Sequence, residues 1–226
     1  METYHSEQEQ VEALKNWWRE NAKGVIGGIV IGLGAVFAVW AWRDYHQTKT
    51  EKAAVEYRQL VDEVKRGAAK EGLERGARLM GEFSDTPYAV LAALANARIA
   101  LDNDDVAAAR KQLEWALAHA RETTLQQLAR LRLARVMLEL GDGQAALKLL
   151  SDVEAGGFSA EYAEVQGDSY LALKQPGPAR SAYQRALQAL PAGTDKAVLL
   201  QMKLDDLGAV NTAVPFTAPS TAPAKP

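Results

Sequence analysis

The distribution of apolar residues divides the chain into one uninterrupted hydrophobic stretch and a long amphipathic remainder. Residues 24–42, GVIGGIVIGLGAVFAVWAW, contain no charged side chain, and Lys23 and Arg43 flank them directly. As a helix this stretch would be about 28 Å long, close to the hydrocarbon thickness of a bilayer. Tryptophans lie before it and at its end, as is typical of membrane interfaces. The pattern predicts a transmembrane helix over 24–42.

Two other interpretations of residues 24–42 fit the sequence less well. A buried core helix of this length would be expected to have a polar face. A cleaved signal peptide has a shorter apolar region of about 7–15 residues, and Trp40 and Trp42 would crowd its cleavage position. We therefore expect an uncleaved signal anchor that crosses the membrane once and contacts lipid.

Glycine recurs at intervals of four residues in the first half of the predicted transmembrane helix, at Gly24, Gly28 and Gly32. A face without side chains allows another helix to approach closely. These glycines are therefore candidate packing residues for lateral pairing with a membrane partner or a second copy. The alternative is that they reflect only the general frequency of glycine in transmembrane helices.

The segment before the anchor, residues 1–23, is amphipathic. Val11, Leu14 and Trp18 recur at helical spacing, which predicts a helix that lies on the membrane surface or extends the transmembrane helix. Lysine and arginine occur on both sides of 24–42, so charge alone does not choose an orientation. Long domains can cross despite their charge, which leaves a small preference for a cytoplasmic N-terminus.

Small, aromatic and apolar residues recur in pairs of predicted helices between residues 43 and 207. The clearest unit, 160–191, has the small–aromatic–small–aromatic–small–proline order of a tetratricopeptide repeat (TPR). Small residues let antiparallel helices cross closely, aromatic residues fill the space between hairpins, and proline ends the second helix. Weaker copies precede this unit. The residues assigned to the pattern are Ala95, Ala109, Ala134, Ala146, Gly167, Tyr170, Ala179, Tyr183, Ala186 and Pro191.

The two ends of the repeat array are expected to be capped, because repeats bury their apolar faces only by stacking on neighbours. A degenerate hairpin at 53–83 and a last helix at about 195–207 are the candidates. Residues 208–226 are rich in Pro, Ala and Thr and are expected to be disordered. The sequence thus predicts an all-α protein: a single N-terminal transmembrane helix followed by a TPR-like α-solenoid over 43–207.

Composition and motifs argue against a catalytic site, a metal site and a nucleic-acid partner. The chain has no cysteine, which excludes disulfides, thiolate metal sites and a cysteine nucleophile. A net charge of −3 without a basic patch argues against a nucleic-acid partner. The histidines lie far apart, and no HExxH, GxSxG or phosphate-loop motif occurs. We expect a protein-binding module without enzymatic activity, cofactor or metal.

The first helix of each TPR lines a concave groove in which partners bind. The expected register places Asn96, Arg135 and Asp168 at the central groove position, with Glu139 and Glu164 nearby. These five residues are candidates for contact with a protein partner. The alternative is that they form ordinary solvated surface.

Four segments resemble one known family. EQEQVEALKNWWREN (7–21) before a glycine-rich apolar helix, LAALANARIAL (91–101), QLEWAL (112–117) and VLLQMKLDDL (198–207) are similar to the YfgM family, ancillary subunits of the bacterial SecYEG translocon. The resemblance covers roughly residues 1–208. It implies an inner-membrane protein with a cytoplasmic N-terminus and a periplasmic TPR domain. It also implies association with SecYEG and with the membrane-anchored chaperone PpiD, and transfer of secreted clients to periplasmic chaperones.

Other functions are compatible with an anchor and repeats alone. A TPR scaffold for envelope assembly or division is the main alternative, and a cytosol-facing adaptor would result if the anchor inserts the other way. An envelope enzyme is disfavoured by the missing catalytic motif.

Overall fold

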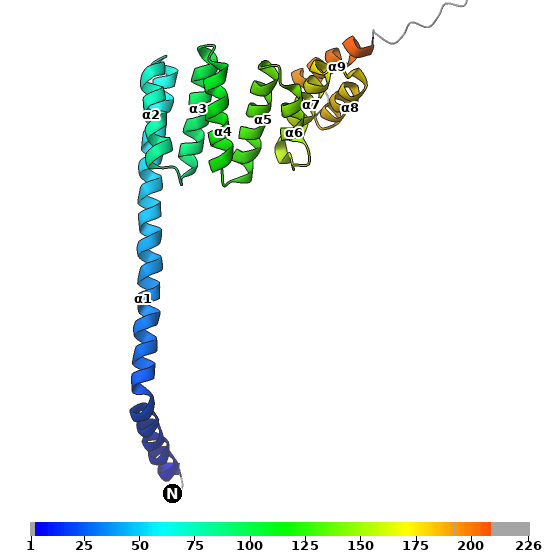
Figure 1. The fold of residues 1–226 in the computed structure, drawn as a ribbon. Helices are drawn as coiled ribbons and strands as arrows, with labels where there is room; N and C mark the ends of the chain where they lie inside the picture. The colour runs from blue at the N-terminus through cyan, green and yellow to red at the C-terminus, as the bar shows by residue number, and fades with distance from the viewer. Residues whose placement is uncertain (1–2, 192, 209–226) are drawn as a thin grey trace, which may run out of the picture. The chain divides into compact units, whose positions relative to one another are not determined.

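All regular secondary structure in the described part of the chain is helical, which confirms the predicted all-α class. The computed structural model describes residues 3–191 and 193–208, with side chains from Glu9 onward. The predicted disordered tail lies, apart from Gly208, outside the described residues. The helices follow one another in chain order in Figure 1: α1 (Thr3–Lys65), α2 (Ala69–Glu82), α3 (Pro87–Asp102), α4 (Val106–His119), α5 (Thr123–Glu139), α6 (Gly143–Leu150), the short 3₁₀ helix η1 (Gly156–Phe158), α7 (Ser159–Ala172), α8 (Pro176–Gln188) and α9 (Asp195–Gly208).

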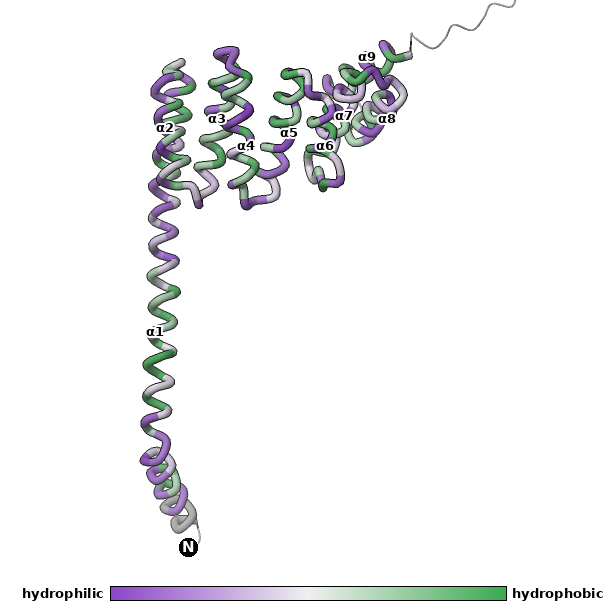
Figure 2. The backbone as a smooth tube through the Cα atoms, in the orientation of Figure 1, coloured by the Kyte–Doolittle hydropathy of each residue, from purple (hydrophilic) through white to green (hydrophobic). Residues whose placement is uncertain are grey.

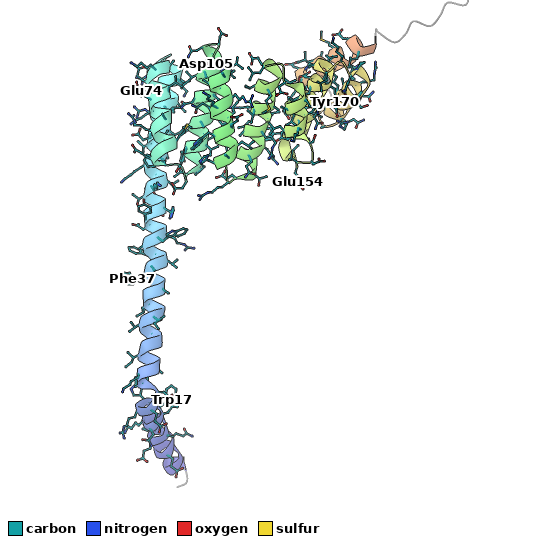
Figure 3. All side chains as sticks on the ribbon, in the orientation of Figure 1. Trp17, Phe37, Glu74, Asp105, Glu154 and Tyr170 are labelled. Atoms are coloured by element: carbon teal, nitrogen blue, oxygen red, sulfur yellow. The ribbon has the colours of Figure 1, made fainter. Side chains whose placement is uncertain are left out.

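The chain divides into two compact units, and the first, Met1–Lys52, contains most of α1. Its apolar side chains are open on all sides: Ile31 is 75% exposed and Phe37 69%. Phe37 projects from the helix in Figure 3, and Figure 2 shows the hydrophobic band of α1 between hydrophilic segments. Within the described residues, α1 is the one helix long and apolar enough to cross a membrane, judged by length and composition. Lipid would bury the side chains that the protein leaves exposed.

The second unit, Ala53–Pro226, is a series of antiparallel helical hairpins in its described part. Residues 53–65 of α1 pair with α2. In the same way α3 pairs with α4, α5 with α6, and α7 with α8. Each hairpin turns through one residue in the left-handed region: Gly67 (φ 75°), Asp104 (58°), Gly141 (82°) and Lys174 (59°). These turn residues are 37, 37 and 33 positions apart, which is the period of a TPR array.

The residue after each turn residue is the N-cap of the second helix of its hairpin. Asp105 accepts a hydrogen bond from the backbone N–H of Ala108 at 2.8 Å, and Asp142 accepts one from Ala145 at 3.0 Å. Both side chains satisfy an amide that the helix itself leaves unpaired. In the last hairpin, Pro176 occupies the first turn of α8, where its missing N–H costs nothing.

Small residues lie where the helices cross. Ala109, Ala134, Ala146 and Ala179 are completely buried, and Gly167 of α7 packs directly on the ring of Tyr183. A Cβ added to Gly167 would lie 2.4 Å from Tyr183 Cε1. Among the other residues of the pattern, Ala186 is buried, Ala95 and Tyr170 are half-buried, and Pro191 is exposed after the end of α8.

Both ends of the repeat array are closed by helices. At the N-terminal end, Ala53 and Leu60 of α1 form an apolar cluster with Leu79 of α2 and Ala92 of α3. At the C-terminal end, Leu200 and neighbouring leucines of α9 cover Tyr183. The 53–83 hairpin and the 195–207 helix were both predicted as caps, and both pack against the adjacent repeat.

Candidate protein-binding groove

The turn geometry fixes the register of the groove. Arg98, Arg135 and Asp168 each lie six residues before a left-handed turn residue, at Asp104, Gly141 and Lys174. They are therefore equivalent positions in three successive repeats.

The expected assignment of Asn96 to this groove position needs correction, because α3 and α4 are joined by a turn of the same length as α5 and α6. The turn register places Arg98, two residues further along α3, at the position equivalent to Arg135. Asn96 instead faces α2 and is only 2% exposed. A Cβ on Gly76 would lie 2.2 Å from its Oδ1, an atom without a hydrogen-bond partner. Asn96 is a packing residue that requires glycine at position 76, and it is not accessible to a partner.

Arg135 and Glu139 line an open groove between α3 and α5, and their contact with a protein partner stays a prediction. The groove has a volume of about 560 Å³, and Leu113 of α4 contributes to its floor. Its other lining residues are Leu94, Ala97, Arg98 and Leu101 from α3, and Arg132 and Val136 from α5. The combination of an apolar floor and charged walls suits a polypeptide segment with both kinds of side chain.

Arg98 and Arg132 also line the groove, although neither was among the expected groove residues. Arg132, Arg135 and Glu139 are spaced i, i+3 and i+7, so they share one face of α5. This spacing was a usable signal for Arg132. Arg98 required the correct turn length, which repeat spacing alone did not provide.

The groove is electropositive at its centre. Arg132 is exposed, but the surrounding protein removes part of its hydration, and this loss lowers the pKa of its guanidinium. Tyr57 opposes the shift, whereas the positive charges of Arg135 and Arg98 lower the pKa of Arg132 further. Arg98 is paired with Asp102 one turn along α3, at 2.8 Å. Arg132 and Arg135 have no such ion pair with a described carboxylate.

Glu164 and Asp168 on α7 are held by residues of the chain itself. Lys203 of α9 lies 3.1 Å from Glu164 Oε1 and 2.8 Å from Asp168 Oδ1, and the Tyr183 hydroxyl donates to Asp168 at 2.6 Å. Burial alone would lower the pKa of Lys203, but the two carboxylates raise it above its usual value. Burial, together with the charge of Asp168, raises the pKa of Tyr183. Glu164 and Asp168 are therefore already paired with a side chain of α9.

The glycine face of α1 is open within the first unit. A Cβ added at Gly24, Gly28 or Gly32 would meet no atom within 4 Å. The structure thus leaves space for another helix along this face.

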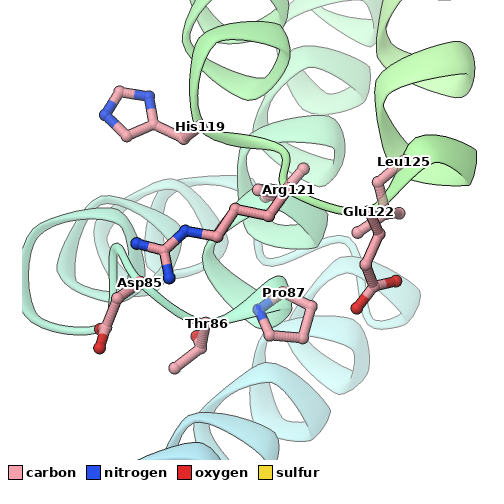
Figure 4. Close-up of a pocket in the computed structure, with 8 residues that line it drawn as sticks. Asp85, Thr86, Pro87, His119, Arg121, Glu122 and Leu125 are labelled. Carbon is pink, nitrogen blue, oxygen red and sulfur yellow. The ribbon is translucent and has the colours of Figure 1, made fainter.

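A second, smaller hollow lies between the loop before α3 and the loop before α5. Figure 4 shows its lining, which includes Asp85, Pro87, His119 and Arg121. Its volume is about 130 Å³, too little for more than a side chain. Within the described ranges, no group of three or more His, Asp or Glu side chains is placed to hold a metal ion.

Comparison with known proteins covers both the anchor and the repeats. The model of the tetratricopeptide repeat-like domain family matches residues 15–209. An ancillary SecYEG translocon subunit of Aggregatibacter actinomycetemcomitans is 32% identical over 89% of this chain and 97% of its own length. The chain belongs to the family of ancillary SecYEG translocon subunits. Family proteins with the same description from Escherichia coli strain K12 and Haemophilus influenzae are 30% and 29% identical, over 92% and 89% of this chain and 99% and 97% of their own lengths.

Proposed function

We propose that this protein is a membrane-anchored adaptor that associates with the Sec translocon and passes newly secreted polypeptides to periplasmic chaperones. The observation that carries the proposal is the extent of the family match, since relatives described as ancillary SecYEG translocon subunits align with about nine-tenths of the chain, anchor and repeats together. A TPR-like groove with exposed charged residues supplies a protein-binding surface. No catalytic step is needed for this role.

The proposed topology has residues 1–23 in the cytoplasm, 24–42 in the inner membrane and the repeat domain, 43–207, in the periplasm. Among the helices of the described part of the chain, only α1 is long and apolar enough to span a bilayer, which supports one membrane crossing. A periplasmic repeat domain would meet polypeptides as they leave the translocon. It would also meet a membrane-anchored chaperone of the PpiD type, the second partner that we propose.

Association with the translocon is testable by co-purification. The full-length protein with a C-terminal tag is extracted from membranes in a mild detergent, and SecY is measured in the eluate by immunoblotting. Recovery of SecY in proportion to the bait supports the proposed function. Equal recovery of SecY with an unrelated single-pass membrane protein, or no recovery at all, would refute it and favour a scaffold unrelated to secretion.

The glycine face of α1 is a proposed contact with another transmembrane helix. The variant Gly28→Leu fills this face, whereas Gly34→Leu adds the same volume about 120° further around the helix. We expect only the first variant to reduce SecY recovery, because only close helix approach requires the small residues. Equal recovery with both variants would place the translocon contact elsewhere.

A further inference from the structure

Alternate helices of the second unit form a row, and the spaces between them differ in charge. The row contains α3, α5, α7 and α9, which are the first helices of successive hairpins and the final cap. The space between α7 and α9 is closed by opposite charges. Lys196 lies 2.6 Å from Glu161 and Lys203 2.8 Å from Asp168.

The equivalent space between α3 and α5 has like charges on both sides. Arg98 comes from α3, and Arg132 and Arg135 come from α5. This is where the open groove of about 560 Å³ lies. The central repeat position is arginine on both α3 and α5, whereas on α7 it is Asp168, which Lys203 neutralises. At the α3–α5 space Arg98 is paired with Asp102 and Glu139 also lines the groove, but Arg132 and Arg135 form no ion pair with a described carboxylate. Asp168 thus has a paired counter-charge within the chain, whereas these two arginines have none.

Several arginines around a partly dehydrated groove repel one another, and an anion from outside would relieve both the repulsion and the lost hydration. The chain's own segment 209–226 offers no Asp or Glu side chain to these arginines. A flat lipid surface would not reach Leu94 and Leu113 at the apolar part of the groove. A peptide carries carboxylates and apolar side chains together, and so matches both features.

We propose that the α3–α5 groove binds an acidic segment of a partner protein, whose Asp or Glu carboxylates contact Arg132 and Arg135 while its apolar side chains cover the floor. The inference deepens the proposed adaptor function and rests on it. It also assigns a division of roles within the row: the first space receives the partner, and the last is filled by α9.

The test uses the full-length protein in nanodiscs of phosphatidylcholine. The probe is a fluorescein-labelled peptide of about twelve residues composed of Glu, Leu and Ser, and the control peptide has Gln in place of Glu. We expect the Glu peptide to bind the wild type at least about tenfold more tightly than the Gln peptide. Raising the salt concentration should weaken the binding of the Glu peptide but not that of the Gln peptide.

Two charge-matched variants locate the site. Arg132→Glu/Arg135→Glu should weaken Glu-peptide binding at least about tenfold and favour a Lys-containing peptide instead. Lys111→Glu/Lys148→Glu changes the net charge equally at exposed positions of α4 and α6 outside the groove, and should bind like the wild type. Arg132→Gln/Arg135→Gln removes the charges without reversal, and should also lose the preference for the Glu peptide. The melting temperatures of all variants establish that each is folded.

The contrary outcomes are distinct. No preference of the wild type for the Glu peptide, or equal losses in the groove and control variants, would overturn the inference. Arginine-dependent binding of phosphatidylglycerol vesicles without binding of the Glu peptide would make the groove a lipid site, and would overturn it too. SecY co-purification with the wild type is measured in parallel. If SecY is recovered while the peptide does not bind, the groove inference fails and the proposed function stands.

Discussion

Replacing Gly167 by alanine should destabilise the last repeat, although alanine normally favours a helix. The new Cβ would lie 2.4, 2.5 and 2.9 Å from three carbons of the Tyr183 ring. Ordinary contact begins near 3.4 Å, so the ring would have to move by about 1 Å to restore normal packing. Tyr183 is completely buried, and its hydroxyl is fixed on Asp168 at 2.6 Å. The ring therefore has little freedom to retreat.

The expected magnitude follows from two opposing effects. Overpacking a core costs about 1–3 kcal/mol, and the fixed ring places this site near the upper value. Alanine gains back about 1 kcal/mol of helix propensity relative to glycine. The net loss should be about 2 kcal/mol, equivalent to a fall in melting temperature of roughly 4–8 °C for a unit of this size.

The assay is urea denaturation of the full-length protein in detergent micelles, followed by circular dichroism, with hydrogen exchange of α7 and α8 to localise the effect. Gly81→Ala in α2 is the matched control, because its Cβ would meet no atom within 4 Å. The control should be neutral or slightly stabilising. If Gly167→Ala is as stable as the control, with unchanged exchange in α7 and α8, then the close helix crossing inferred at this glycine does not exist.

Three further substitutions test other contacts by the same denaturation assay. Glu63 accepts hydrogen bonds from Arg75 at 2.9 and 2.7 Å, and this bonding lowers the pKa of the Glu63 carboxyl. Glu63→Gln should therefore lower the free energy of unfolding by about 1–3 kcal/mol at neutral pH. That stabilisation is present above the pKa of Glu63 in the unfolded chain and is lost as the pH falls through its lowered pKa in the folded protein. The free energies of unfolding of the wild type and of Glu63→Gln should therefore converge in acid. A difference that stays constant with pH would contradict the assignment. Asn96→Asp should lower the free energy of unfolding by at least about 3 kcal/mol, because it buries an unpaired charge. A much smaller loss of stability would mean that the site is hydrated. Lys203→Met should speed hydrogen exchange in α9 but not in α3, since its ion pairs hold α9 on α7. Unchanged exchange would show that the leucines and the Lys196–Glu161 pair hold α9 without Lys203.

The fold was predictable because its signals are local and repeated. The uncharged run at 24–42 and the small residues at helix crossings, such as Ala179, follow directly from composition and spacing. The turn residue Lys174, in contrast, adopts a left-handed conformation. A lysine does not indicate such a conformation in the sequence, so the turn geometry of the clearest repeat was visible only in the structure.

The groove was predictable only in part. Arg135 and Glu139 were placed correctly beside it, but the register of α3 depended on a turn length that a degenerate repeat does not reveal. An error of two residues rotates the assigned side chain by about 200° around the helix, which exchanged the accessible Arg98 for the buried Asn96. Contacts from distant segments were also hidden. Nothing near Asp168 in the sequence indicates that Lys203 neutralises it.

The most direct test of the central claim is the location of the repeat domain relative to the membrane. Proteinase K is added to intact spheroplasts that express the full-length protein, and the second unit is followed by immunoblotting, with a cytoplasmic protein as the control for lysis. Digestion of the repeat domain in intact spheroplasts is the result that a periplasmic adaptor at the translocon predicts. Protection there, with digestion only in inverted membrane vesicles, would put the repeats in the cytoplasm and contradict the proposed function.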